Sequence, residues 1–364
     1  DRIEDDALVD SLDSETISRM GDSTVAASLR RISGLTLVGD KFVYVRGLGE
    51  RYSSTSLNGA FIPSPDLTRN VVPLDVFPSA IVSSLAVQKT FSPDISANYA
   101  GGSIDIVTTP FPDKGLNFSA ELGSGWNSEA DNLKTYSGGS DDDWGTDDGS
   151  RQLPSQIIQG LQAYQGSIGV QSILAGLGRT AEGGTLSQAI AINTDYALSL
   201  NRDMAIIQKS STPDVDGRVS FGNTYDFTSD LEGGIQLGGA YASKWRNKER
   251  RQAVFSTPDQ EFENESETTY SVDISATATA GLRYLSEHEL TVASLMLRNS
   301  DDEVSISDFH NENRQVSSGL GFRDYRMEFE EREMLVNQVK GEHVLGLTTK
   351  ELLRGWADWL PTDA

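Results

Sequence analysis

The sequence predicts a membrane β-barrel, antiparallel and incomplete in this chain, with about seven strands and an α/β domain in front of it. Two observations carry this prediction. From Leu116 onward, apolar and polar residues alternate along successive segments, as they do in strands that face lipid on one side and water on the other. Before that point, short helical and strand patterns follow one another with turn residues between them. We therefore divide the chain into an α/β domain over residues 1–113 and a barrel portion over residues 114–364.

The composition excludes several classes of function. The chain has 364 residues, with 54 acidic and 30 basic side chains and a formal net charge of −24. A surface this acidic repels phosphate backbones, so no nucleic-acid partner is expected. No uncharged apolar run reaches about 18 residues, which rules out a transmembrane helix. The N-terminal residues lack the basic start and apolar core of a secretion signal. Cysteine is absent, so thiol chemistry and disulfides are excluded.

The first 113 residues show the elements of a small mixed sheet with a helix. A helix is predicted over 23–32, because Val25, Leu29 and Ile32 recur at helical spacing and Gly34 can take the left-handed position after its end. Four short, β-branched segments bounded by Gly, Pro or Asp are predicted strands: 35–38, 42–46, 85–89 and 104–108.

The barrel portion alternates with the period of a strand, and its apolar faces end in aromatic residues, as expected of a girdle at a membrane interface. Short connections at 227–231 and 284–289 alternate with long, polar, acidic loops at 128–215, 247–268 and 301–322. Short turns on one side and long loops on the other are typical of outer-membrane barrels. The segments that carry the pattern are 116–126, 219–227, 235–245, 272–284, 290–298 and 325–345.

The loop at 128–215 is too long to be featureless. Residues 156–177 could form a helix or two, and residues 195–208 could add a further pair of strands without changing the side on which the loops lie.

Four stretches of the sequence carry motifs in a fixed order. They contain an amphipathic helix, a strand ending in Arg-Gly, a Leu-Asn-Gly turn and a Gly-Gly-x-Ile-x-Ile-Val strand. Together they resemble the plug domain and early barrel of TonB-dependent receptors, and four motifs in order are a specific signal. The stretches are DSTVAASLRRISGLTL (22–37), VYVRGLGERYSSTSLNGAFIPSPDLTRNVVPLDVFPS (43–79), LAVQKTFSPDISANYAGGSIDIVTTPF (85–111) and DDDWGTDDGSRQLP (141–154).

The resemblance implies a transporter of the Gram-negative outer membrane, with a plug filling the lumen of a barrel of about 22 strands. It implies ligand-gated active import of a scarce nutrient, whether a small molecule or an oligomer, driven by TonB and its inner-membrane motor complex. Outer-membrane lipid and lipopolysaccharide are the other implied partners. The resemblance implies neither an enzymatic activity nor a cofactor.

About seven strands cannot close a barrel, because the smallest bacterial barrels have eight. An open sheet edge in lipid is costly, so the chain is predicted to be part of a longer protein or to be completed by another chain. The ending at 356–364 stops within a predicted strand. The alternative function is therefore a receptor without transport, or a structural barrel subunit. A TonB-binding segment is not evident before Asp10, where 7–9 is the best candidate.

Arg46 ends a predicted strand and precedes Gly47. In the family the corresponding Arg reaches barrel carboxylates and helps to hold the plug, so the resemblance implies a latch between plug and barrel; a solvated Arg is the alternative. The glycines of these motifs are interpreted as structural, in turns that need a positive φ or at a close approach to the barrel. They are Gly47, Gly49, Gly59, Gly101 and Gly102.

By resemblance, two plug loops point outward beneath the extracellular vestibule. Aromatic and Arg side chains there suit a ligand floor, because they combine contact area with directional polar groups. Packing against the barrel wall is an equal alternative. The predicted ligand-binding residues are Arg51, Tyr52, Phe61, Pro65, Asp66 and Arg69.

The remaining polar clusters predict no catalytic or metal site. The acidic residues of 141–148 surround Trp144 without the spacing of an EF-hand, and are interpreted as a solvated loop. His288, His310 and His343 are far apart in sequence and in different hairpins, so no metal site is predicted. No serine or cysteine has a plausible His partner. The carboxylates of 328–333 are expected to face the lumen.

Overall fold

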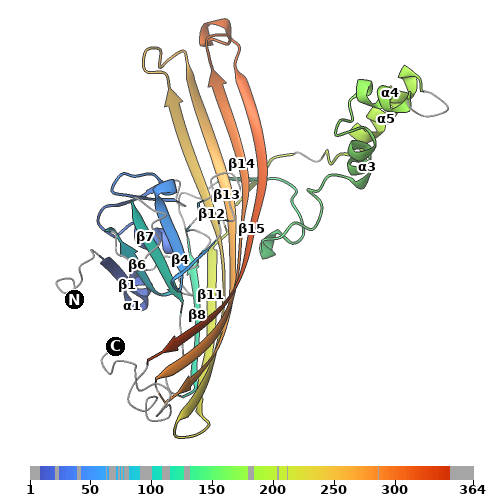
Figure 1. Cartoon of the computed structure of the whole chain (residues 1–364). Coiled ribbons are helices and arrows are strands. Elements are labelled where there is room, and N and C mark those ends of the chain that lie inside the picture. The colour runs from blue at the N-terminus through green and yellow to red at the C-terminus, as the bar shows by residue number, and fades with distance from the viewer. Residues whose placement is uncertain are drawn as a thin grey trace.

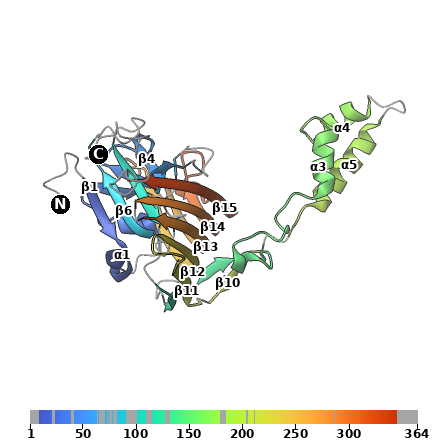
Figure 2. The ribbon, with the colours of Figure 1, turned by 60° about the horizontal axis from the view of Figure 1, so that its bottom comes forward.

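A small N-terminal domain packs on one face of a tall, curved sheet, and a helical excursion leaves the other face (Figures 1 and 2). The arrangement comes from a computed structural model of the chain. It describes residues 9–20, 24–38, 42–62, 64, 71–72, 74, 77, 82–90, 101–108, 115–126, 132–178, 184–202, 205–210, 212–285 and 287–344.

The N-terminal domain contains a five-stranded sheet in the order β1-β6-β7-β4-β5. The sheet is mixed, because β4 runs parallel to β7 while its other pairs are antiparallel. A separate antiparallel pair, β2-β3, lies beside it. The elements are β1 (Val9–Asp13), α1 (Ser14–Met20), α2 (Val25–Leu29), β2 (Leu35–Val38), β3 (Phe42–Val45), β4 (Ser53–Leu57), β5 (Ala60–Phe61), β6 (Val82–Gln88) and β7 (Gly102–Thr108).

Helix α2 is shorter than the predicted helix at 23–32. Its N-cap is Thr24, whose hydroxyl accepts a hydrogen bond from the Ala27 backbone N–H at 3.3 Å. Val25 and Leu29 are fully buried, as the helical spacing predicts. Gly34 takes a φ of +79°, which turns the chain into β2.

The tall sheet has six antiparallel strands in the order β15-β14-β13-β12-β11-β8. The sequence predicts about seven; the strand expected at 356–364 lies outside the described residues. The strands are β8 (Asn117–Gly125), β11 (Asp214–Asp226), β12 (Leu231–Ala253), β13 (Phe262–Tyr284), β14 (His288–His310) and β15 (Phe322–His343).

Two of the predicted long loops are wrong. Most of 247–268 and much of 301–322 continue as strands, so the connections shrink to 254–261 and 311–321. The sequence looks like loop there because both faces of these strands carry polar side chains. Opposite charges instead pair across the ladder, as in Lys248 with Glu267 and Arg250 with Glu265. A strand that meets water on both faces needs no apolar face, and such cross-strand pairs support it.

One face of the sheet carries the lipid-facing pattern in its lower part. Leu122, Leu335 and Val339 are 92%, 63% and 72% exposed on the side away from the N-terminal domain. Tyr225 and Tyr284 lie on the same side near the short turns. This exposed apolar band with aromatic residues at one margin is the surface that a membrane barrel presents to lipid.

The excursion between β8 and β11 is helical, which fits the helices predicted in 156–177. The possible strand pair at 195–208 forms only at its end, where Ile207 and Gln208 belong to a short strand that pairs with 133–135 outside the tall sheet. Asp195 lies instead in a helix that begins at a capping box of Thr185 and Gln188. No helix of the described residues is both long enough and apolar enough to cross a bilayer. The elements are β9 (Leu133–Thr135), the 3₁₀ turn η4 (Asp142–Trp144), α3 (Ser155–Ala163), α4 (Val170–Leu177), α5 (Leu186–Ser199) and β10 (Ile207–Lys209).

Candidate functional site

The N-terminal domain and the tall sheet share one hydrophobic core. Leu295 and Leu297 of β14 and Met334 of β15 are buried in the same cluster as Leu29 and Phe77 of the domain. Leu297 is completely inaccessible. The domain is therefore seated on the inner face of the sheet by apolar packing.

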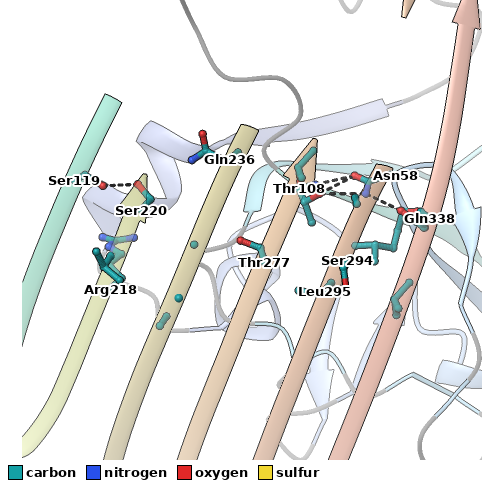
Figure 3. Close-up of a pocket in the computed structure, with 18 of the residues that line it drawn as sticks. Asn58, Thr108, Ser119, Arg218, Ser220, Gln236, Thr277, Ser294, Leu295 and Gln338 are labelled. Carbon is teal, nitrogen blue, oxygen red and sulfur yellow. Dashed lines mark hydrogen bonds between the residues drawn. The ribbon is translucent and has the colours of Figure 1, made fainter. Parts of the chain in front are cut away.

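A polar contact joins the two parts beside this core (Figure 3). The Asn58 amide donates to the Gln338 side-chain oxygen at 2.9 Å, and the Gln338 amide donates to the Leu57 carbonyl at 2.8 Å. Asn58 has a φ of +53° and accepts a hydrogen bond from the Thr108 backbone N–H at 2.9 Å. The Asn58 side chain is thus held both by Thr108 of its own domain and by Gln338 of the sheet. Asn58 is not among the predicted site residues, although its place before Gly in the Leu-Asn-Gly turn is a signal that could have found it.

A cavity of about 150 Å³ lies next to this contact, between Leu57 and Asn58 of the domain and the inner wall of the sheet. Figure 3 shows Thr277 and Ser294 on its wall, with Ser119 and Ser220 bonded to each other at 2.7 Å farther along. Small polar side chains, rather than bulky apolar ones, therefore line much of the wall that faces the domain.

A larger cavity of about 560 Å³ lies between the domain and the upper half of the sheet, toward the hairpin tip at 254–261. Its walls carry both signs of charge, and ion pairs such as Lys244 with Asp273 at 3.5 Å link neighbouring strands. A space with several charged groups and access toward the longer loops has the chemistry to bind a polar ligand. The lining residues include Thr24, Ala27, Arg30 and Leu37 of the domain and Lys244, Arg246, Lys248, Glu267, Asp273, Asp301, Glu303, Arg326, Glu328 and Glu330 of the sheet.

The structure separates the predicted ligand-binding residues. Tyr52 precedes β4 and Phe61 lies in β5, at opposite ends of β4. The Arg51 guanidinium lies 4.7 Å from the centre of the Tyr52 ring, and this pair lies at the end of β4 away from Gln338. Pro65, Asp66 and Arg69 lie outside the described residues.

Phe61 does not fit a floor beneath the long loops. Its neighbours Gly59 and Ala60 line a cavity with Thr291 and Lys340, close to the end of the sheet where β13 ends and β14 begins. The Leu-Asn-Gly turn reverses the chain at that end, and the sequence does not show which end of the sheet such a turn faces.

The contact of Arg46 also differs from the predicted latch. Its guanidinium donates to the Lys89 carbonyl at 3.0 Å, within the N-terminal domain. Lys89 itself forms a buried ion pair with Asp10 and donates to the Ser33 carbonyl. Within the described residues, Arg46 therefore braces the domain internally, and no contact with a barrel carboxylate is seen.

The predicted structural glycines fall into three groups. Gly47 and Gly59 take φ values of +78° and +79°, which other residues rarely adopt. Gly49 does not, with a φ of −61°, and nothing lies closer than 3.8 Å to where its Cβ would be. A Cβ on Gly101 would meet Leu48 at 3.4 Å, and one on Gly102 would meet Val45 at 2.9 Å.

Substituting Gly102 with Ala should destabilise the N-terminal domain by about 1–3 kcal/mol, because the added methyl overpacks the core. It would also lie 3.1 Å from the Gln88 carbonyl oxygen, which the strand holds in place. The matched control is Gly49→Ala, which meets only ordinary contacts. Hydrogen exchange of the domain's amides measures the difference. Equal protection in the two variants would contradict the close approach at Gly102.

The foot of the excursion, residues 132–151 and 207–209, packs on the outer face of the sheet. Leu133 is fully buried against Trp245 and Tyr270, whose rings stack at 4.4 Å. Tyr270 also donates to an Asp143 carboxylate oxygen at 3.0 Å. Ladder residues alternate between faces, so this face lies opposite the charged cavity. The foot covers aromatic side chains that the strands would otherwise expose to water.

Arg151 organises part of the acidic segment at 141–148. Asp141, Asp143 and Asp148 are exposed, as in the solvated loop that the sequence predicts, whereas Asp142 and Asp147 are half-buried. The Arg151 guanidinium forms two hydrogen bonds with Asp142, at 2.6 and 2.8 Å, and one with Asp302 of β14 at 3.0 Å. Asp147 lies 3.4 Å away. Burial raises the pKa of Tyr136, which accepts a hydrogen bond from Arg151, to about 12.

The other polar predictions have mixed outcomes. Glu328 and Glu330 line the charged cavity, as expected, but Glu333 faces the other side and pairs with Arg298 at 2.9 Å. No group of three potential metal ligands occurs among the described residues. The placement of His288 and His343 in different hairpins is wrong, because they lie opposite one another in the hairpin of β14 and β15.

Comparison with protein families identifies the N-terminal domain. Residues 2–103 match the model of the TonB-dependent receptor plug domain. No curated protein matches the chain.

Among solved structures, the chain is similar to the siderophore receptor PirA from Pseudomonas aeruginosa, with 12% identity, a TM-score of 0.33, and coverage of 92% of this chain and 52% of that one. It is also similar to the ferric citrate transporter FecA, with 13% identity, a TM-score of 0.30, and coverage of 93% and 61%. A third similar structure is the outer membrane transporter YddB from Escherichia coli, with 8% identity, a TM-score of 0.31, and coverage of 91% of this chain and 53% of that one. The chain thus spans about half to three-fifths of the length of these structures.

Residues 2–103 therefore form a plug domain like that of the TonB-dependent receptors.

Proposed function

We propose that the protein takes part in ligand-gated, TonB-dependent import of a scarce nutrient across the outer membrane. The observation that carries the proposal is the shared core of plug and sheet, in which Leu295, Leu297 and Met334 pack against the plug. A domain held in this way on the inner wall obstructs passage through the barrel. Import then requires the plug to shift or rearrange when energy is supplied.

The charged cavity supports a binding step before transport. It lies between the plug and the upper sheet, toward the tip at 254–261, where a ligand arriving from outside would enter. Arg51 and Tyr52 are proposed ligand contacts at the end of β4 away from Gln338, and Pro65, Asp66 and Arg69 are further proposed contacts. Both signs of charge on the walls favour a polar ligand that can pair with each.

TonB, outer-membrane lipid and lipopolysaccharide are the proposed partners. In this mechanism the ligand changes the seating of the plug, and TonB then pulls on its periplasmic side. Arg46 is proposed to engage barrel carboxylates at some stage of that movement, exchanging its bond to Lys89 for them. The hydrogen bonds of Gln338 with Asn58 and with the Leu57 carbonyl must open for the plug to leave the wall.

A covalent link across this contact tests the proposal. The chain has no cysteine, so Asn58→Cys with Gln338→Cys creates the only thiol pair. Closing it with a short bifunctional methanethiosulfonate reagent should lower nutrient uptake at least tenfold, and reductant should restore it. The nutrient is first found by comparing growth of a deletion strain and its parent on ferric siderophores, cobalamin, oligosaccharides and peptides.

The single variants treated with the same reagent are the controls, since they keep the chemistry without the link. Full uptake by quantitatively linked protein would contradict a moving plug. Ligand binding without any uptake, linked or not, would favour a receptor that does not transport.

A further inference from the structure

Two histidines face each other at the short-turn end of the tall sheet. His288 begins β14 and His343 ends β15, and the ladder places them directly opposite one another. Their Nδ1 atoms are 3.2 Å apart, and their ring centres are 5.2 Å apart. The whole chain has only three histidines, and the third, His310, lies at the far end of β14.

The distance between the two nitrogens suits a shared metal ion. An ion bound by imidazole lies about 2.0–2.1 Å from each nitrogen, so two ligands at angles between 90° and tetrahedral have nitrogens roughly 2.8–3.4 Å apart. The observed 3.2 Å falls within this range. Without a metal, the same distance is a hydrogen bond in which one ring donates its Nδ1–H to the other. A metal ion would take the place of that proton.

The surrounding sheet holds the pair in position. Directly opposed residues of an antiparallel ladder have Cβ atoms about 4.5–5.5 Å apart, so both rings start from fixed points. The Tyr284 ring lies nearly parallel to the His288 ring, with a centroid distance of 6.4 Å and an interplanar angle of 16°. Little ordering of the chain would therefore be needed on binding.

The site would remain open on its outer side. His343 is exposed, and the adjacent carboxylates of Glu289 and Glu342 belong to the opposite face by strand alternation. Because no cluster of three potential ligands occurs within the described parts of the chain, the two imidazoles would be the ligands supplied from those parts. Water would occupy the other coordination positions.

We propose that His288 and His343 form a two-histidine site for a divalent transition-metal ion. Imidazole nitrogen suits copper, nickel and zinc, and the usual order of affinities places Cu²⁺ first. Such an ion links the end of β14 to the end of β15 and stabilises that edge whenever it is bound. The site faces away from the plug, so it is independent of the proposed import function.

The test is Cu²⁺ binding to purified, tag-free protein in detergent, followed by isothermal titration calorimetry and electron paramagnetic resonance. Wild-type protein should bind one equivalent, with superhyperfine splitting from two imidazole nitrogens. His288→Gln and His343→Gln should each weaken binding at least tenfold, because one imidazole cannot chelate. His310→Gln is the matched control and should bind as wild type does.

The outcomes separate the metal site from a hydrogen bond between two rings. The resonance measurement on wild-type protein needs no variant to fold. A spectrum with one imidazole nitrogen or none would overturn the proposal. So would unchanged Cu²⁺ affinity in His288→Gln or His343→Gln, or a loss of binding in His310→Gln.

Discussion

Replacing Leu297 with Ala is expected to destabilise the seating of the plug on the sheet by about 2–5 kcal/mol, the usual cost of a buried Leu-to-Ala change. Leu297 is 0% exposed and packs in the core that plug and sheet share. Both the plug and the sheet line the cavity that the change leaves behind, so the change weakens the packing between them. Hydrogen exchange of plug amides in detergent-solubilised protein should speed up accordingly.

Leu335→Ala is the matched control for this change. Leu335 is in β15, beside the strand that carries Leu297, but its side chain points outward and is 63% exposed. The same atoms are removed without a cavity next to the plug. Plug exchange should remain at the wild-type rate, and equal acceleration in both variants would show that the effect is not specific to the shared core.

Replacing Arg151 with Met should release the foot from the outer face of the sheet. The change leaves the carboxylates of Asp142, Asp147 and Asp302 without their shared cation. Arg151 is 16% exposed and its partners are 12–18% exposed, so we expect a cost of about 3 kcal/mol, near the lower end for a broken buried pair. Proteolysis within 132–151 should become much faster.

Two further variants test that explanation. Arg151→Met combined with Asp302→Asn removes one of the carboxylates left without a cation, and should recover part of the resistance to proteolysis. Arg323→Met breaks an exposed pair with Asp308 elsewhere on the sheet, and exposed pairs contribute little. It should leave proteolysis of the foot unchanged. If Arg151→Met is cleaved no faster than wild type, the foot is held by its apolar contacts instead.

The sequence predicted the strands where lipid imposes a pattern. Alternation is strict in segments such as 116–126 and 272–284, because one side of the wall must be apolar. The same strands continue into water, where both faces can be polar and the pattern vanishes. The errors at 247–268 and 301–322 follow from that change of solvent, since a polar strand and a polar loop have the same composition.

The candidate site was predictable only in part. The motif around Gly47 and Gly59 indicated turns, and both residues have positive φ. The contact of Asn58 with Gln338 spans 280 positions, and the meeting of His288 with His343 depends on the register of a ladder. Neither register nor the orientation of the plug leaves a local trace in one sequence. Phe61 was misplaced for the same reason.

The length of β12 to β15 has a consequence for the cell surface. Each has 22 or 23 residues, which is roughly 75 Å of chain at about 3.3 Å per residue, whereas crossing the hydrocarbon takes only about 9–11. Much of every hairpin therefore extends beyond the bilayer. The fully exposed Phe255, in the connection between β12 and β13, would be among the first groups met by an antibody or a phage, before either reached the lumen.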